Sequence, residues 1–371
     1  MDRTGLNKTL LDHLEAMPNV KLMFNHKLVG VDFRRKVAWF EHRPTSIEHQ
    51  GDETEKSFDL MIGADGAHSG VRYQMMKYVQ MSFQQEYIDK LWCQFHVPPA
   101  ADGDFRIPPN YLHIWPQDES MFIALPNLDK SFTATLFLTK SGFEQLDATG
   151  KVVEYFHRRF PGVVPDLITE DELRKQYKTN QHLPLISIKC TPYHYGDSGV
   201  IVGDAAHAMV PFYGQGMNAG LEDVRVLFDF LDKYPGDRSK ALSEYTKERT
   251  PDAQTINDLA LGNYREMASD VKKPLYLLRK WIEEQLYLYV PSLGWATQYS
   301  RVTFSNMRYS EVQRATQRQA KILNGVVGLA LASIIGSAFI FARTGGIRKA
   351  QRGFLKSICW IAQWTQKLIE G

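Results

Sequence analysis

Residues 199–220 combine residue types and spacings that suit a ligand site. Residues 199–202 are apolar enough for a short strand, and a small-residue corner, a glycine-rich turn and a helix follow. Asp204 stands where a carboxylate accepts a hydrogen bond from a ligand hydroxyl, and Gly214 and Gly216 let the backbone approach a flat or anionic ligand. The start of the following helix adds free N–H groups and a partial positive charge. This order predicts a cofactor site.

A second apolar run ends in a similar turn. Residues 59–63 lead into Ala64, Asp65 and Gly66, with Ser69 and Arg72 a few positions later. An Asp-Gly pair after a strand is a common turn signal, so alone it leaves a plain turn and a site equally open. Its place ahead of the Asp204 motif, with a strand-rich stretch between the two, favours a site.

The two motifs in this order resemble the fingerprints of the flavin-dependent aromatic hydroxylases. That resemblance implies an α/β fold with a partial FAD-binding Rossmann-like domain, an inserted β-sheet substrate domain of α+β type and a helical C-terminus. It also implies six cofactor-binding residues, which are Arg3, Leu28, Asp65, Asp204, Met217 and Asn218. Asp204 would bind the ribityl chain of FAD, and the helix start would lie against the flavin pyrimidine edge. The alternative is an ordinary strand–loop–helix crossover whose buried Asp caps the helix.

Four segments resemble the kynurenine 3-monooxygenases within that family more specifically. They are residues 110–116, 124–132 with its matches at 124–127 and 130–132, 210–218, and 302–305 with Arg308 and Tyr309 after it. The resemblance implies L-kynurenine as substrate, hydroxylated to 3-hydroxykynurenine in tryptophan degradation and NAD synthesis. FAD would be the cofactor, with NADPH and O2 as co-substrates.

The same resemblance assigns the substrate-binding residues. Asn263 and Tyr299 would donate hydrogen bonds to the substrate carboxylate, which suits an amide and a phenol. Pro211 and Phe212 would line the catalytic pocket in which the aromatic ring is hydroxylated. We expect no catalytic base at His207 and assign it to packing against the flavin loop.

The glycine signature of a dinucleotide-binding domain does not occur in the sequence. A flavin hydroxylase is expected to have a strand, a G-x-G-x-x-G turn and a helix, yet no such turn is found. The resemblance implies that roughly the first hundred residues of the family pattern are not in this chain, since Arg3 matches an interior residue of the domain. Two alternatives to a kynurenine hydroxylase therefore stay open: a non-catalytic remnant that binds a membrane or partner, and a ubiquinone-type ring hydroxylase.

Composition narrows the class of partner and compartment. Lys and Arg number 44 against 42 Asp and Glu, a balance that argues against a nucleic-acid footprint. Cys93, Cys190 and Cys359 match neither a zinc spacing nor a disulfide framework, so we expect a reducing compartment and no metal.

Hydrophobic periodicity predicts the elements that must position these residues. We expect helices over 4–16, 150–179, 217–232, 238–269 and 273–289, strands over 20–24, 27–33, 37–40 and 185–190, and a meander over 88–140. The expected domains are 1–85 and 191–235 for FAD, 86–190 for substrate, 236–320 for a helical region, and 321–371 for a membrane anchor with an amphipathic tail.

Residues 322–342 carry no charge over 21 positions, close to the ~20 that a membrane span needs. Basic residues flank both sides, which leaves the orientation open. Residues 354–369 have the pattern of an interfacial amphipathic helix. A buried core helix is the alternative, whereas the family resemblance implies an anchor in the mitochondrial outer membrane.

Overall fold

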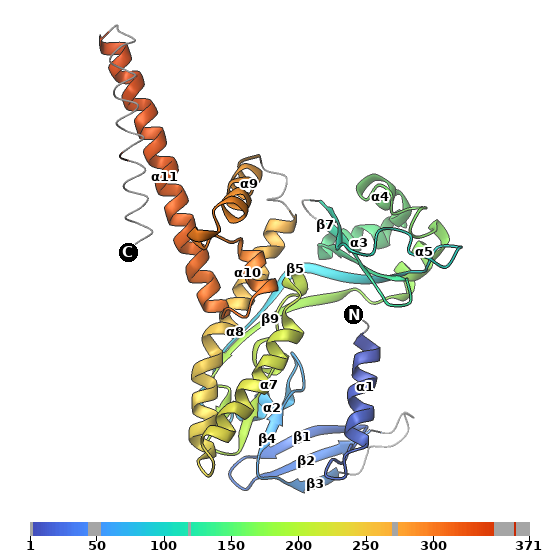
Figure 1. Ribbon diagram of the computed structural model, residues 1–371. Helices are drawn as coiled ribbons and strands as arrows, with labels where there is room; N and C mark the ends of the chain where they lie inside the picture. The colour runs from blue at the N-terminus through green and yellow to red at the C-terminus, as the bar shows by residue number, and fades with distance from the viewer. Residues whose placement is uncertain (1–2, 44–52, 118–119, 269–273, 345–359, 361–371) are drawn as a thin grey trace. The chain divides into compact units, whose positions relative to one another are not determined.

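The computed structural model describes residues 3–43, 53–117, 120–268, 274–344 and 360. The chain divides into two compact units, Met1–Lys272 and Lys273–Gly371. Helices and strands are mixed along the chain, as the expected α/β fold requires (Figure 1).

A three-stranded sheet carries the two acidic motifs. It has the order β10 (His194–Tyr195), β11 (Gly199–Ile201), β4 (Met61–Gly63). Strands β11 and β4 are parallel, with Ile201 opposite Gly63. The carboxyl ends of the two strands therefore lie at one edge of the sheet, and Asp65 and Asp204 follow directly after them.

An antiparallel sheet precedes it in the chain. Helix α1 (Arg3–Glu15) leads to β1 (His26–Asp32), β2 (Val37–His42) and β3 (Glu53–Ser57), which pair in that order. The strand expected over 20–24 was wrong, because this segment is irregular and leaves Met23 and Phe24 exposed. Helix α2 (Gly70–Met75) follows β4.

The largest sheet is antiparallel with the order β6-β7-β8-β5-β9. Its strands are β5 (Ser82–Val97), β6 (His113–Pro116), β7 (Ser120–Pro126), β8 (Phe132–Leu138) and β9 (Leu183–Thr191). Helices α3 (Lys140–Thr149), α4 (Val152–Arg159) and α5 (Glu170–Thr179) share one hydrophobic core with the sheet. Phe95, Phe122, Leu136, Phe156 and Phe160 are fully buried there.

Strands β5 and β9 run between the two cores of the first unit (Figure 1). They pair along most of their length, from Ser82 opposite Thr191 to Trp92 opposite Leu183. Cys93 on β5 belongs to the core of the large sheet, whereas Cys190 on β9 belongs to the core around β4 and β11. The paired strands therefore connect the core around β4 and β11 to the core of the large sheet.

Two short and two long helices complete the first unit. Helix α6 (Asp204–His207) and the 3-10 turn η1 (Pro211–Tyr213) precede α7 (Gly216–Lys233) and α8 (Arg238–Ala268). The long helices pack against each other, and α8 also contacts η1 and β9.

The second unit is helical over its described part. It contains α9 (Pro274–Tyr289), η3 (Pro291–Leu293), α10 (Gln298–Phe304) and α11 (Tyr309–Thr344). Within α11, Tyr309–Phe339 is long and apolar enough to cross a bilayer, by length and composition alone. The amphipathic helix expected over 354–369 lies, apart from Trp360, outside the described residues.

Candidate cofactor site

Asp204 stands at a turn that touches helix α7. It is exposed and opens the four-residue helix α6. Gly203 before it has a φ of 59°, a conformation that favours glycine. A Cβ atom on Gly220 would lie 3.5 Å from the Gly203 Cα, so the turn and the second turn of α7 are in close contact. The small residues of the motif are therefore required by packing.

The N-terminus of α7 offers backbone donors. Gly214 ends η1 with a φ of 66°, and α7 begins at Gly216 without a side-chain cap or an acidic residue in its first turn. Met217 and Asn218 in that turn are exposed, and the Asn218 amide donates to Gln215 Oε1 at 3.2 Å. An uncapped helix start directs N–H groups and positive potential toward an acceptor on a ligand.

Asp65 closes its own loop. Its Oδ1 accepts from the Ser69 hydroxyl at 2.5 Å and its Oδ2 from the Val71 amide at 3.0 Å. Ser69 in turn caps α2 by accepting from the Arg72 amide at 2.9 Å. Leu28 lies beside this loop, since a Cβ atom on Gly70 would be 3.9 Å from Leu28 Cδ2. Sequence analysis placed both Asp65 and Leu28 at the cofactor, and the structure places them next to each other.

Arg72 joins the two motifs. Its guanidinium donates to the Ala67 carbonyl and to the Ala205 carbonyl, both at 2.7 Å. The side chain is buried and lies 4.9 Å from the centre of the Phe83 ring. Burial lowers the pKa of Arg72, although Cys190 and Asp65 oppose the shift. The loops after β4 and β11 are thus fixed to one another, a link that sequence analysis did not foresee.

A buried network stands behind Asp204. Asp223 Oδ2 accepts from the Gly203 amide at 2.8 Å and lies 2.5 Å from His207 Nε2, while Oδ1 accepts from Arg249 Nε at 2.7 Å. Burial alone would raise the pKa of Asp223, but His207, Arg249 and the Gly203 amide together hold it below its usual value. The carboxylate is therefore ionised, and His207 Nε2 is the donor. His207, expected only to pack, is hydrogen-bonded.

The residues expected around the substrate fall into two groups. Phe212 is buried between Phe137 and Tyr264, with ring-centre distances of 4.9 Å and 4.5 Å, whereas Pro211 is exposed. The buried Asn263 amide donates to the Phe212 carbonyl at 2.8 Å. Burial, with a smaller contribution from Asp89, raises the pKa of Tyr264 to about 12. Pro211, Phe212 and Asn263 therefore form one wall.

Two further candidates belong to other parts of the chain. Tyr299 belongs to α10 of the second unit, where it is 47% exposed and its ring packs edge-on to Phe304. Arg3 begins α1, and its side chain is outside the described residues.

The residues at the Asp204 turn fit FAD. The exposed Asp204 carboxylate suits a ribityl hydroxyl, and the uncapped start of α7 suits an electron-rich ring edge. Because Gly203 and Gly220 are in contact, no side chain of these two residues separates the Asp204 turn from α7. Among the described residues, no group of three or more His, Cys, Asp or Glu side chains is placed to hold a metal ion.

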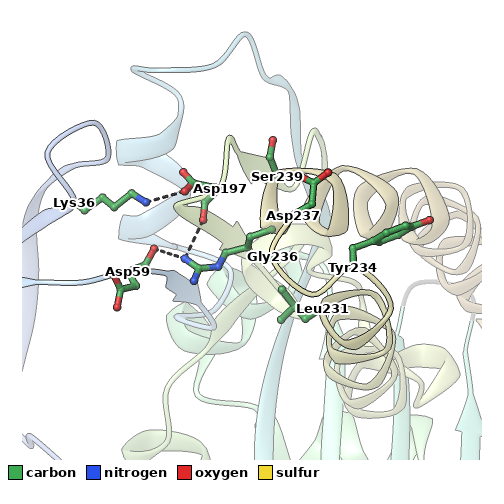
Figure 2. A pocket seen from close by; sticks show the side chains of 9 residues that line it. Lys36, Asp59, Asp197, Leu231, Tyr234, Gly236, Asp237 and Ser239 are labelled. Carbon is green, nitrogen blue, oxygen red and sulfur yellow. Dashed lines mark hydrogen bonds and ion pairs between the residues drawn. The ribbon is translucent and has the colours of Figure 1, made fainter.

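Figure 2 shows the residues that line a separate hollow of about 570 Å³. Asp59 and Asp197 line it, and they precede β4 and β11, at the opposite ends of these strands from Asp65 and Asp204. Arg238 donates to the Asp59 carbonyl at 2.7 Å, and Lys36 pairs with Asp197 at 2.8 Å. The hollow is thus lined by an ion pair and by an arginine bonded to backbone carbonyls, and we do not place the cofactor there.

Comparison with known proteins decides the family. The model of the FAD binding domain family matches residues 2–260. The kynurenine 3-monooxygenase of Phaeosphaeria nodorum is 76% identical over the whole of this chain and 77% of the relative. The chain belongs to the kynurenine 3-monooxygenase family. Kynurenine 3-monooxygenase acdD of Aspergillus candidus is 56% identical, over 91% of this chain and 70% of the relative.

Solved structures of flavin monooxygenases share the fold of this kynurenine 3-monooxygenase family member. The tetrameric form of 2-methyl-3-hydroxypyridine-5-carboxylic acid oxygenase matches with a TM-score of 0.56 at 20% identity, over 74% of this chain and 70% of that one. Klebsiella pneumoniae HpxO, complexed with FAD and uric acid, matches with a TM-score of 0.53 at 18% identity, over 76% and 67%. The expectations of the family, the α/β fold and FAD binding are confirmed.

Sequence analysis missed the network residues Asp223 and Arg249. One signal was present in α7, where Asp223 shares the buried stripe of Ala219, Val226 and Leu227. An acidic residue on a buried helix face requires a partner.

Proposed function

We propose that the protein hydroxylates the aromatic ring of L-kynurenine to 3-hydroxykynurenine. The reaction consumes NADPH, a proton and O2, places one oxygen atom on the ring and releases the other as water. The observation that carries this proposal is the 76% identity, over the whole chain, to a kynurenine 3-monooxygenase. The non-catalytic remnant and the ubiquinone-type hydroxylase are not favoured, because the relatives with 52–76% identity share the kynurenine name.

Reduced FAD supplies the reactivity toward O2 in this family, and the protein supplies binding and orientation. We assign Asp204 to the ribityl chain and the α7 start at Met217 and Asn218 to the flavin pyrimidine edge. The Asp65 loop, Leu28 and Arg3 belong to the same cofactor contact surface. In this assignment residues 1–85 and 191–235 bind FAD, and residues 86–190 form the substrate domain.

The substrate ring is placed against the Phe212 wall. Phe212 is held on two sides by Phe137 and Tyr264 and at its carbonyl by Asn263, so it is a fixed apolar surface with Pro211 exposed beside it. Such a wall keeps water out of the place where the ring is hydroxylated. Asn263 and Tyr299 are proposed to bind the amino-acid carboxylate of kynurenine as neutral donors.

Helix α11 is proposed to anchor the enzyme in the mitochondrial outer membrane. Its support is the run of 21 uncharged residues at 322–342 and the length and apolar composition of Tyr309–Phe339. An apolar helix of this length is long enough to span the ~30 Å hydrocarbon core.

Removal of the Asp204 carboxylate tests the cofactor assignment. A hydrogen bond to a charged group contributes about 1.5–3 kcal/mol, so Asp204→Ala should raise the FAD Kd about ten- to a hundredfold. Purified Asp204→Ala protein should be depleted of flavin absorbance relative to protein. Asp197→Ala is the matched control, because Asp197 lies at the other end of β11. Equal flavin occupancy in Asp204→Ala and the control would refute the assignment.

A further inference from the structure

We propose that His207, Asp223 and Arg249 are positioning residues that set the direction of Asp204 toward FAD, an inference that rests on the proposed assignment of Asp204. None of the three was expected to serve the cofactor from the sequence. Each is fully or almost fully buried behind the Asp204 turn, with exposed fractions of 1%, 0% and 2%. They act through the backbone of Gly203 and the ends of α6.

The conformation of Gly203 determines how the chain leaves strand β11. Its φ of 59° and ψ of −140° are rarely adopted by residues with a side chain. Both backbone polar groups of Gly203 are bound. The amide donates to Asp223 Oδ2 at 2.8 Å, and the carbonyl accepts from the amides of Ala206 and His207 at 2.8 Å and 2.9 Å. Asp204 is the next residue, so this turn aims its carboxylate.

One carboxylate oxygen binds both ends of helix α6. Asp223 Oδ2 contacts Gly203, which precedes the helix, and His207 Nε2, which belongs to its last residue. A helix of four residues has little stability of its own, because nucleation is unfavourable. The orientation of α6 therefore depends on contacts such as these two. Since Asp204 is its first residue, the Asp223 carboxylate controls the position of the whole motif.

Arg249 fixes Asp223 from the neighbouring helix. Its Nε donates to Asp223 Oδ1 at 2.7 Å, its Nη1 to Glu222 Oε2 at 2.8 Å, and its Nη2 to the Ala219 carbonyl at 3.3 Å. All three partners belong to α7, whose first turn is the other half of the cofactor surface. The network thus links α6, α7 and α8 behind both parts of the surface that faces FAD.

A purely structural ion pair is the competing explanation. Buried charged groups are weak stabilisers, since an apolar core of equal volume is often as stable. The hydrogen-bond pattern favours positioning, because Asp223 bonds to the backbone of the motif itself. The ring of His207 is also anchored on one side only, as Nδ1 is buried without a hydrogen-bond partner in the described part of the chain. Its other ring nitrogen, Nε2, contacts Asp223.

The test compares FAD affinity with stability in the holoenzyme. His207→Leu removes the donor to Asp223, and His207→Gln keeps an N–H donor at a similar reach. We expect the FAD Kd, measured by flavin fluorescence titration, to rise about tenfold in His207→Leu and at most about threefold in His207→Gln. The visible circular dichroism of flavin at saturating FAD should change in His207→Leu, because the cofactor sits in a shifted site. Asp223→Asn should show the same spectral change.

Tyr177→Phe is the control for a lost side-chain hydrogen bond that is partly buried. Tyr177 donates to Asp147 Oδ1 at 2.8 Å in the core of the large sheet, away from the cofactor motifs. The Tyr177→Phe substitution should lower the Tm of the apoprotein and leave the FAD Kd and the flavin spectrum unchanged. A His207→Leu protein that loses as much Tm as this control but keeps the wild-type FAD Kd and spectrum would overturn the inference. If Asp223→Asn does not fold, the comparison of His207→Leu with His207→Gln still tests the positioning role.

Asp204→Ala separates failure of this inference from failure of the proposed function. If Asp204→Ala weakens FAD binding and His207→Leu does not, the positioning role is wrong while the cofactor assignment stands. If neither variant weakens FAD binding, the assignment of Asp204 is wrong, and the positioning role is wrong with it.

Discussion

At the scale of single residues, the contact between Asn263 and Phe212 changes what a substitution of Asn263 measures. The amide holds the Phe212 carbonyl at 2.8 Å, so its loss affects the pocket wall as well as any donor to substrate. Tyr299 belongs to α10 of the second unit, where its ring packs edge-on to Phe304. The two residues therefore make separable predictions.

We expect Asn263→Ala and Tyr299→Phe each to raise the KM for L-kynurenine about ten- to a hundredfold, since each loses a hydrogen bond to a charged group worth about 1.5–3 kcal/mol. Flavin occupancy should stay at the wild-type level. With a decarboxylated kynurenine analogue, Tyr299→Phe should match wild type, while Asn263→Ala should keep part of its defect because Phe212 is released. Unchanged KM values for L-kynurenine in both variants would remove the proposed carboxylate site.

The charge state of Asp223 predicts a pH dependence of stability. Burial raises its pKa, but His207, Arg249 and the Gly203 amide outweigh burial and lower it overall. A carboxylate whose folded pKa lies below the unfolded value of about 3.9 contributes stability above that pH and loses it as the pH falls through the folded pKa. The free energy of unfolding of Asp223→Asn should therefore lie below that of wild type at pH near 7, and the gap should narrow below about pH 4. Urea unfolding at several pH values measures this gap, and a gap that stays constant into acid would contradict the ionised state.

At the scale of elements, local patterns predicted the helices better than the strands. The periodicity over 217–232 and 238–269 corresponds to α7 at Gly216–Lys233 and α8 at Arg238–Ala268, because an amphipathic helix is specified by its own residues. The alternation over 20–24 did not produce a strand, since a strand needs a partner and this segment has none among the described residues.

The proposed cofactor site was predictable only in its local parts. Asp65 and Asp204 each follow an apolar run, so the sequence indicated both motifs. Their link through Arg72 and the Ala205 carbonyl joins residues 133 positions apart. The bond between Gly203 and Asp223 likewise depends on how α7 packs, which no pattern within residues 199–220 specifies.

Helix α11 makes a prediction about the membrane. Arg301 on α10 donates to Gln319 on α11 at 2.6 Å, so a chain that ends after Lys321 keeps this contact and loses the uncharged run together with residues 343–371. The truncated protein should move from the membrane pellet to the supernatant, with unchanged flavin occupancy. Leu331→Lys should weaken membrane retention because a central Lys costs about 2.5–3.5 kcal/mol on insertion scales, and Leu331→Ile is its matched control. A truncated protein that still pellets with membranes would show that α11 is not the anchor.

At the scale of the whole molecule, the first unit contains both the proposed cofactor surface and the aromatic wall around Phe212. Strands β5 and β9 run from the core around β4 and β11 to the core of the large sheet, and they pair with each other. The two cores are therefore connected by paired strands. The sequence indicated the fold class and FAD, because both depend on short motifs. It did not indicate the pairing of β5 with β9, which joins residues about a hundred positions apart.

The reaction product under isotopically heavy O2 tests the central claim most directly. FAD-loaded protein is given NADPH and L-kynurenine in normal water, and the products are separated and analysed by mass spectrometry. We predict 3-hydroxykynurenine with one heavy oxygen atom on its ring, formed in proportion to the NADPH consumed. NADPH oxidation that yields hydrogen peroxide without hydroxylated kynurenine, or a product whose new oxygen comes from water, would contradict the assignment of this protein as a kynurenine-hydroxylating monooxygenase.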